Sequence, residues 1–174
     1  MTVLECYATY KPEIGYVQGM SYLAAHLLLY NDTYYTFMCF ANLVESNFFQ
    51  ALFKMEIKLI LRHMRVFDLL FSHNLPKLFE RFQEMTISPE QYLLNWFITI
   101  FTTSLPIPTA SKIWDHYIYY GEIYLYRTAL GILLAHKKQL MEADFEKGVS
   151  SLRKLPETMN EDELFQSIAQ ISVH

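Results

Sequence analysis

The sequence predicts an all-helical fold in which the helices pack irregularly rather than as a regular bundle. Apolar residues recur at the spacing i, i+3, i+4 and i+7, which is typical of one face of an α-helix. Alternating patterns bounded by hairpin turns, which would indicate strands, are missing from the sequence. The breakers between apolar segments are short and predict helix-to-helix connections rather than linkers between domains. Because the 174 residues are 52% hydrophobic and 18% charged, we expect one core and a single domain over residues 1–174.

In the first half of the chain, apolar stripes and one cap indicate four helices. Leu4, Tyr7 and Ala8 share a helical face, and no start signal is evident before that face. Asp32 is expected to cap the helix that follows it. Two further stripes have the full helical spacing: Met20, Leu23, Ala24 and Leu27 in one, and Ile57, Ile60, Leu61, Met64, Phe67 and Phe71 in the other.

In the second half, five more helices are expected: Glu90 to Thr103, Ala110 to Tyr120, Leu125 to Leu140, Asp144 to Lys154 and Glu161 to Ile171. Ser88 before Pro89, and Asn160 three residues before Glu163, have the residue types and spacing that cap helix starts. The predicted breaks between helices are at Asn74 to Pro76, Leu105 to Pro108, Gly121 and Pro156.

The composition argues against several classes of function. The net charge of −4 comes from 14 basic and 18 acidic residues, which is too even a mixture for the basic field that nucleic-acid binding needs. Cys6 and Cys39 lack CxxC spacing, so we expect neither a disulfide framework nor a zinc site, and the cytoplasm is the expected compartment. The longest nearly uncharged stretch, Ile14 to Tyr30, contains polar side chains and is better explained by a buried helix than by membrane insertion.

Motifs for cofactors and metals are also missing from the sequence. The five glycines cannot supply a GxxxxGK phosphate loop or a GxGxxG dinucleotide fingerprint, so we expect no nucleotide bound by the chain itself and no cofactor. The six histidines lack the pairing of a metalloenzyme helix, and we expect no metal site. His26 and His136 are on apolar stripes and are expected to pack in the core. Serine and cysteine nucleophile motifs have no support in the sequence, although a spatial triad stays open.

Three basic residues, Lys58, Arg62 and Arg65, recur at i, i+4 and i+7 opposite the apolar stripe of their predicted helix. They form one basic helical face. We favour a solvated face over two alternatives, a contact with an acidic partner and a contact with a membrane.

One segment is not explained by packing alone. The run Ile14-Gly15-Tyr16-Val17-Gln18-Gly19-Met20-Ser21 places two glycines and an amide at the start of an apolar helix. It resembles the Tyr-x-Gln-Gly-Met motif of TBC domains, which are Rab GTPase-activating domains, although Ser21 stands where many members carry Asn. Downstream segments resemble successive signatures of the same family in the same order: Trp96, Ser104-Leu105-Pro106, Ile113-Trp114-Asp115, Gly121 and Leu125-Tyr126-Arg127-Thr128-Ala129-Leu130. The resemblance spans essentially the whole chain.

The resemblance implies an all-helical domain that accelerates GTP hydrolysis on a Rab-type small GTPase, which itself carries the GTP and magnesium. In the family, a glutamine of the Tyr-x-Gln motif positions the attacking water, and the matching residue here is Gln18. An amide suits this role because it can accept from water and donate to a phosphate oxygen without adding negative charge. The alternative is that Gln18 only caps or hydrogen-bonds the turn between Gly15 and Gly19.

The family's arginine finger, in an Ile-x-x-Asp-x-x-Arg motif upstream of Tyr-x-Gln, has no counterpart here. None of the 15 residues before Tyr16 is Arg, and Lys11 cannot reproduce the planar fork of a guanidinium. We therefore expect the N-terminal part of the domain to be missing, either because the chain is a piece of a longer protein or because it is naturally shortened. Gln18 alone is then expected to give weak catalysis, and the lost helices to leave apolar surface exposed.

The other matched positions have expected roles. Tyr16 and Gly19 are expected to contact the partner, with the Tyr16 ring packed under the loop. Trp96 and Trp114 are expected in the core, and Asp115 with Arg127 as a buried or partly buried polar pair. The chain would serve vesicle traffic and intracellular protein transport, and would reach endomembranes only through the lipid-anchored GTPase.

Two other classes of function stay open. The first is a catalytically inactive TBC-like module that binds a GTPase or another trafficking factor. The second is an unrelated helical scaffold. A Gln18 that is exposed beside a concave groove would argue against the scaffold.

Overall fold

The computed structural model describes residues 2–155 and 160–173, and every regular element within these ranges is a helix. The all-α prediction is confirmed. The helices are α1 (Val3–Tyr10), α2 (Met20–Leu28), α3 (Thr33–Val44), α4 (Asn47–Phe53), α5 (Ile57–Asn74), α6 (Pro76–Glu84), the short 3₁₀ helix η1 (Pro89–Gln91), α7 (Leu93–Ile98), α8 (Ile107–Tyr120), α9 (Ile123–Ala135), α10 (Lys137–Glu142), α11 (Phe145–Arg153) and α12 (Glu161–Gln170).

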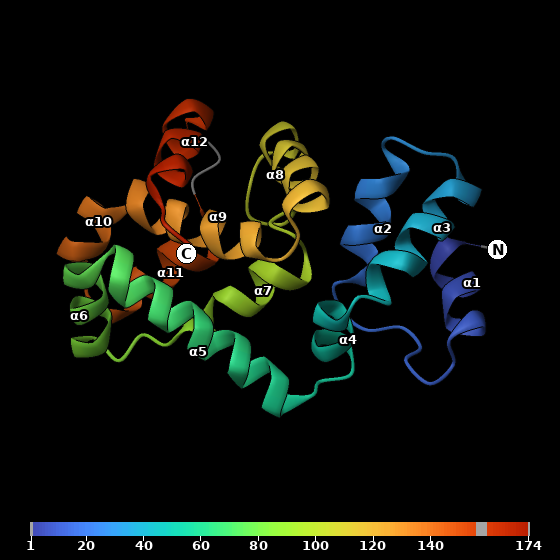
Figure 1. Cartoon of the computed structure of the whole chain (residues 1–174), viewed down its shortest axis with the longest axis horizontal. Helices are drawn as coiled ribbons and strands as arrows, with labels where there is room; N and C mark the ends of the chain where they lie inside the picture. The colour runs from blue at the N-terminus through green and yellow to red at the C-terminus, as the bar shows by residue number, and fades with distance from the viewer. Residues whose placement is uncertain (1, 156–159, 174) are drawn as a thin grey trace.

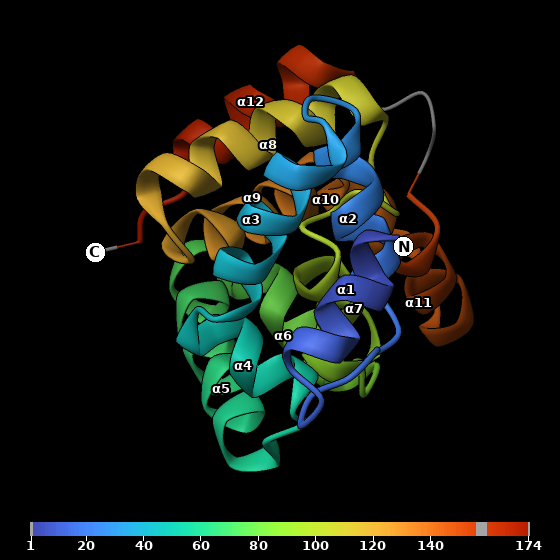
Figure 2. The same cartoon turned by 90° about the vertical axis from the view of Figure 1, so that its right-hand side faces the viewer.

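The helices surround α9, which packs against α12, α8, α5, α7 and α10. Nine of its residues are buried, so α9 is the centre of the core. Helices α1, α2 and α3 form one end of the molecule, and α6, α10 and α12 gather at the other (Figure 1). Seen from the α1–α3 end, α5 again lies along the lower edge (Figure 2). Among the described residues, no helix combines the length and apolar character that a membrane span requires.

Capping explains several helix starts. Asp32 accepts a hydrogen bond from the Tyr35 backbone N–H at 2.9 Å, and Asn160 caps α12, so both predicted caps are confirmed. The expectation that α1 lacks a start signal is wrong. Thr2 and Glu5 form a reciprocal capping box, in which each side chain accepts from the other residue's backbone N–H. Ser88 makes no capping hydrogen bond, and only the 3₁₀ turn η1 follows it.

The long helix α5 confirms part of its predicted stripe. Ile60, Met64, Phe67 and Phe71 are buried. Ile57 and Leu61, which were expected on the same buried face, are exposed instead. The reason is geometric, because at 100° per residue both lie at one border of the stripe rather than at its centre.

The predicted helix from Glu90 to Thr103 is wrong beyond Ile98. The chain reverses there, because Ile100 and Phe101 both have left-handed backbone angles, with φ of 45° and 60°. The Phe101 N–H donates to the Trp96 carbonyl at 2.8 Å and closes the reversal. Both side chains are fully buried, so core packing offsets the backbone strain.

Elsewhere the structure divides one predicted helix and adds two helices. The expected helix from Leu125 to Leu140 is two helices, α9 and α10, which meet at His136. Helices α4 and α6 were not predicted. The break at Asn74 to Pro76 is confirmed, since α5 ends at Asn74 and α6 begins with Pro76 at its first position. The predicted break at Pro156 lies outside the described residues.

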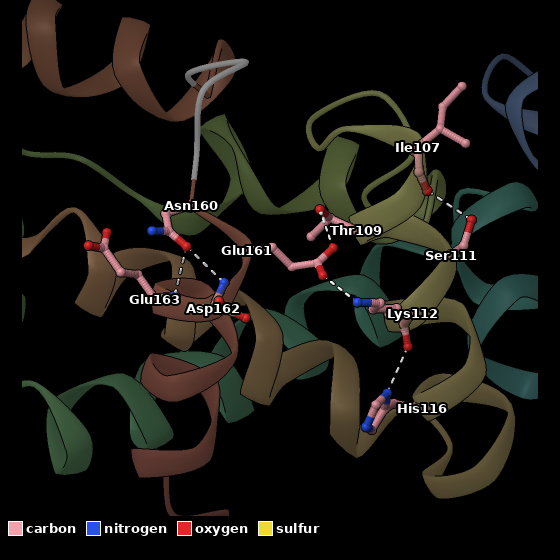
Figure 3. A network of polar contacts seen from close by, with 9 residues as sticks. All are labelled: Ile107, Thr109, Ser111, Lys112, His116, Asn160, Glu161, Asp162 and Glu163. Atoms are coloured by element: carbon pink, nitrogen blue, oxygen red, sulfur yellow. Dashed lines mark hydrogen bonds and ion pairs between the residues drawn. The ribbon is translucent and has the colours of Figure 1, made fainter.

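Helix α12 is fixed to α8 at its N-terminal end (Figure 3). The Glu161 carboxylate pairs with the Lys112 ammonium and accepts a hydrogen bond from the Thr109 hydroxyl at 2.9 Å. The Lys112 hydrogen bond, followed by that of Thr109, lowers the pKa of the Glu161 carboxyl. Together with the Asn160 cap, these contacts hold the helix that covers α9.

Candidate functional site

The segment that carries Gln18 connects α1 to α2 and begins with a tight turn. The N–H groups of Ile14 and Gly15 both donate to the Lys11 carbonyl, at 3.1 and 2.9 Å. Gly15 has a φ of +63°, which favours glycine. The Lys11 ammonium also pairs with the Glu45 carboxylate at the end of α3, at 2.7 Å. The base of the segment is therefore tied to two helices.

Gly19 positions the far end of the segment. It precedes α2 with a φ of +104°, and it is buried. A Cβ atom at this position would lie 2.2 Å from Cγ2 of Ile98 in α7. The structure gives Gly19 a packing role, beside the partner contact that was expected from the sequence. Gly19 is buried within the protein, and because it has no side chain the segment can pack closely against α7.

Gln18 lies between these fixed points, at an exposed position. The Val17 N–H donates to the Met20 sulfur at 3.4 Å, and the Met20 N–H donates to the Val17 carbonyl at 3.2 Å. The Gln18 side chain makes no hydrogen bond with any residue that the structure describes. The alternative role as a cap of its own turn therefore has no contact to support it within the described residues.

Aromatic side chains accompany Gln18 on the surface. Tyr16 is 57% exposed, so its ring does not pack under the loop as expected. Tyr22 follows Gln18 by four residues, in the first turn of α2, and is also exposed. Exposed tyrosines are typical of protein interfaces, because the ring supplies apolar area while the hydroxyl remains hydrated.

Helix α2 is held in place through His26 and Trp114. Their rings stack with centroids 4.5 Å apart, and the Trp114 indole N–H donates to the Thr102 hydroxyl at 3.1 Å. Both residues are buried, and α8 thereby fixes α2. Burial lowers the pKa of the His26 imidazole, with the Asp115 charge acting weakly in the other direction. His26 is thus a neutral packing residue at neutral pH.

The α7 side of the site is fixed by a threonine network. The Thr99 hydroxyl donates to the Asn95 carbonyl at 2.9 Å, and the Asn95 amide donates to the Thr103 hydroxyl at 3.2 Å. These bonds hold the reversed chain directly after Ile98. The sequence alone did not point to Ile98 or to this network, because a left-handed Ile100 has no signal in residue type.

Asp115 and Arg127 do not form the expected polar pair. Asp115 is exposed. Arg127 instead donates from Nε to the Ile168 carbonyl at 3.1 Å and from Nη2 to the Ala169 carbonyl at 3.2 Å. Its role is to bind the C-terminal end of α12. Trp96 is fully buried beside Phe101, in the core under the site.

The described residues contain no group of three His, Cys, Asp or Glu side chains that could hold a metal ion. Gln18 lines neither of two surface hollows, one between α10 and α11 and one between α4, α5 and the start of α9. The site is an exposed loop with a rigid base, and its geometry suits insertion into a partner protein.

Known proteins match this chain over nearly its whole length. A family model described as the Rab-GTPase-TBC domain matches residues 1–141. TBC1 domain family member 14 of Homo sapiens is 41% identical over 172 residues, which is 99% of this chain and 25% of that protein. TBC1 domain family member 12 of Xenopus tropicalis is 38% identical over the same coverage. The chain thus spans about a quarter of the length of these relatives.

A solved structure shows the same fold. The crystal structure of the Chlamydomonas flagellar RabGAP TBC domain superimposes with a TM-score of 0.83 at 25% sequence identity. The match covers 97% of this chain and 56% of that one.

Proposed function

Because the chain belongs to the Rab-GTPase-TBC domain family, we propose that it forms one partial domain, residues 1–174, that stimulates GTP hydrolysis on a Rab-type small GTPase. The observation that carries the proposal is the exposed Gln18, whose amide is unengaged among the described residues and whose flanks are fixed. The GTPase supplies GTP and magnesium, and it recruits the chain to membranes of the vesicle-traffic system.

The proposed role of Gln18 is to position the attacking water. Its Oε1 accepts a hydrogen bond from the water while Nε2 donates to an oxygen of the γ-phosphate. Since the amide is neutral, it adds no negative charge beside the phosphate, where charge is already high. The rigid flanks lower the entropy cost of holding this geometry in the complex.

Tyr16 is proposed as a partner contact beside Gln18. Its exposed ring can bury apolar area against the GTPase. Gly19 and Ile98 are proposed as positioning residues, because they set the direction of the loop.

No residue of this chain is proposed as an arginine finger. Lys11 is the only basic residue before Tyr16, and its ammonium is engaged by Glu45. An arginine finger contributes about 10³- to 10⁵-fold in rate, so we propose that strong activation requires an arginine from outside this chain.

The test is single-turnover GTP hydrolysis across a panel of Rab GTPases. It compares this chain, its Gln18→Ala variant and a version extended upstream to include any Ile-x-x-Asp-x-x-Arg motif. We expect acceleration mainly in the extended form, with a loss on Gln18→Ala. Equal rates with and without the protein, in every form and for every GTPase, would refute the proposal.

A second candidate function is a binding module without catalysis. It applies to this chain by itself, whose sequence carries no counterpart of the Ile-x-x-Asp-x-x-Arg motif. The same panel separates the two, since a binding module would bind a GTPase in every form while leaving the hydrolysis rate unchanged.

A further inference from the structure

Helix α5 carries three exposed cations on one face. Lys58, Arg62 and Arg65 are exposed and form no ion pair with any described residue. Elsewhere the basic side chains of Lys11, Arg81, Lys112 and Lys147 are paired with carboxylates, and Arg127 is bound to backbone carbonyls. Lys54, Lys77 and Lys138 likewise form no ion pair with a described residue, so the three α5 residues, which we term the α5 basic face, are distinguished by sharing one face of a single helix.

Exposed apolar side chains lie among these cations. Leu69 is 71% exposed and follows Arg65 by four residues, so it continues the same line along the helix. Leu59 and Val66 flank that line on one side, and Leu61 on the other, and all three are exposed. The buried stripe of α5 already supplies its contact with the core, so the exposed area of these apolar side chains is not needed for that contact.

The position of α5 makes this face accessible. The helix has 18 residues, which corresponds to about 27 Å, and it lies along the lower edge of the molecule in both views (Figures 1 and 2). The spacing of residues 58, 62, 65 and 69 places them on one ridge that points away from the core.

We propose that the α5 basic face, with Leu69, docks on an anionic membrane surface. Interleaved cations and apolar side chains on one helical face suit the interface, where the cations meet lipid headgroups and the apolar groups enter the acyl boundary. The contact is direct and peripheral, and it adds to any recruitment through a GTPase. From the sequence a solvated face was favoured here, with a membrane contact as one of two alternatives.

A lipid surface fits this face better than an acidic protein segment. The hollow beside α5 is lined by the carboxylates of Glu45, Glu56 and Glu122, so an acidic segment filling it would meet like charges. Leu59, Arg62 and Val66 also line this hollow, whereas Lys58, Arg65 and Leu69 do not, so a flat surface can contact these last three residues without entering the hollow. The rest of the chain is acidic enough to give a net charge of −4, which would orient α5 toward the membrane.

The test is flotation of the 174-residue chain with vesicles, without any GTPase. We expect binding to phosphatidylcholine vesicles that contain about 30% phosphatidylserine, little binding to phosphatidylcholine alone, and a decrease with added salt. The triple variant Lys58→Glu, Arg62→Glu, Arg65→Glu should lower the partition coefficient roughly a hundredfold. Leu69→Gln should lower it by a smaller factor, about fivefold, at unchanged charge.

The matched control changes charge equally on another face. Lys138, Lys147 and Lys154 are exposed on or directly after α10 and α11, and replacing all three with Glu should weaken binding far less. Circular dichroism and the urea midpoint establish that each variant is folded. Equal losses in both triple variants would show a nonspecific charge effect and overturn the proposal. It would also be overturned if the α5 variant left vesicle binding intact, or if it lowered affinity only for a protein such as the GTPase.

Discussion

Gly19 is the residue on which the position of Gln18 depends most directly. Its backbone angle is left-handed, and the space that a side chain would occupy is taken by Ile98. The Tyr-x-Gln-Gly-Met pattern predicts a glycine at this position, but it does not show why a glycine is required. The reason is the packing of the loop against α7, which a sequence cannot show because residues 19 and 98 are far apart in the chain.

We predict that Gly19→Ala lowers the free energy of unfolding by about 2 to 4 kcal/mol, through backbone strain and overpacking. Urea denaturation measures the change. The control is Gly15→Ala in the same segment, where φ is also positive but the nearest atom is 4.0 Å away. It should cost only about 1 kcal/mol. Equal effects of the two substitutions would contradict the proposed contact with Ile98.

His26 and His63 predict a dependence of stability on pH. Burial lowers the pKa of both imidazoles below the ordinary value of 6.5. The unfolded chain therefore binds protons at higher pH than the folded chain, so the free energy of unfolding should fall as pH decreases from about 7.5 to 5.5. Burial raises the pKa of the Asp68 carboxyl, which opposes this trend at lower pH.

Urea midpoints across this pH range measure the effect. Replacing both His26 and His63 with Gln should flatten the dependence, while His73→Gln, at an exposed position, serves as the control. A stability that rises toward pH 5.5 would show that the imidazoles of His26 and His63 are not neutral in the folded chain.

At the scale of elements, α12 is held at both ends, by Glu161 at its start and by Arg127 at its finish. The carbonyls at a helix C-terminus lack intrahelical partners and carry partial negative charge, so a guanidinium suits them. This contact replaces the Asp115–Arg127 pair that the sequence suggested.

We predict an asymmetry between these two residues. Arg127→Met should lower the free energy of unfolding by about 1 to 3 kcal/mol, because two carbonyls lose their donors. Asp115→Asn, on the exposed face of α8, should change it by less than about 0.5 kcal/mol. Thermal or urea unfolding of the two variants gives the comparison, and similar losses in both would restore the pairing that the structure excludes.

An element could be predicted from the sequence where neighbouring residues determine it, and could not where distant contacts determine it. The caps at Asp32 and Asn160 are local, so sequence located α3 and α12 correctly. The end of α7 is set by the burial of Ile100 and Phe101 in left-handed conformations, a tertiary effect that overrides residue preference. The capping box at Thr2 has the expected residue types and could have been found from sequence.

At the scale of the whole molecule, the sequence was sufficient for the fold class and the family. Periodicity predicted an all-helical chain, and the ordered motifs identified a TBC-type domain that the family match confirms. The site was predicted in part. Gln18 and Tyr16 are exposed, but Gly19 is buried, and the contacts that fix the loop come from α7 and α8.

The relatives and the solved structure extend well beyond this chain, which matches about a quarter of the former and 56% of the latter. We therefore propose that this chain supplies one half of a catalytic pair. We predict that Gln18 contributes to the chemical step and not to the stability of the fold, since its side chain makes no hydrogen bond with a described residue.

The most direct test of this claim is the single-turnover hydrolysis rate of a responsive GTPase with a longer form that carries the arginine motif, measured with and without Gln18→Ala. We predict that the rate falls by about 10²- to 10³-fold, while the affinity for the GTPase and the urea midpoint hardly change. An unchanged rate, or a loss that follows affinity alone, would contradict the water-positioning role of Gln18.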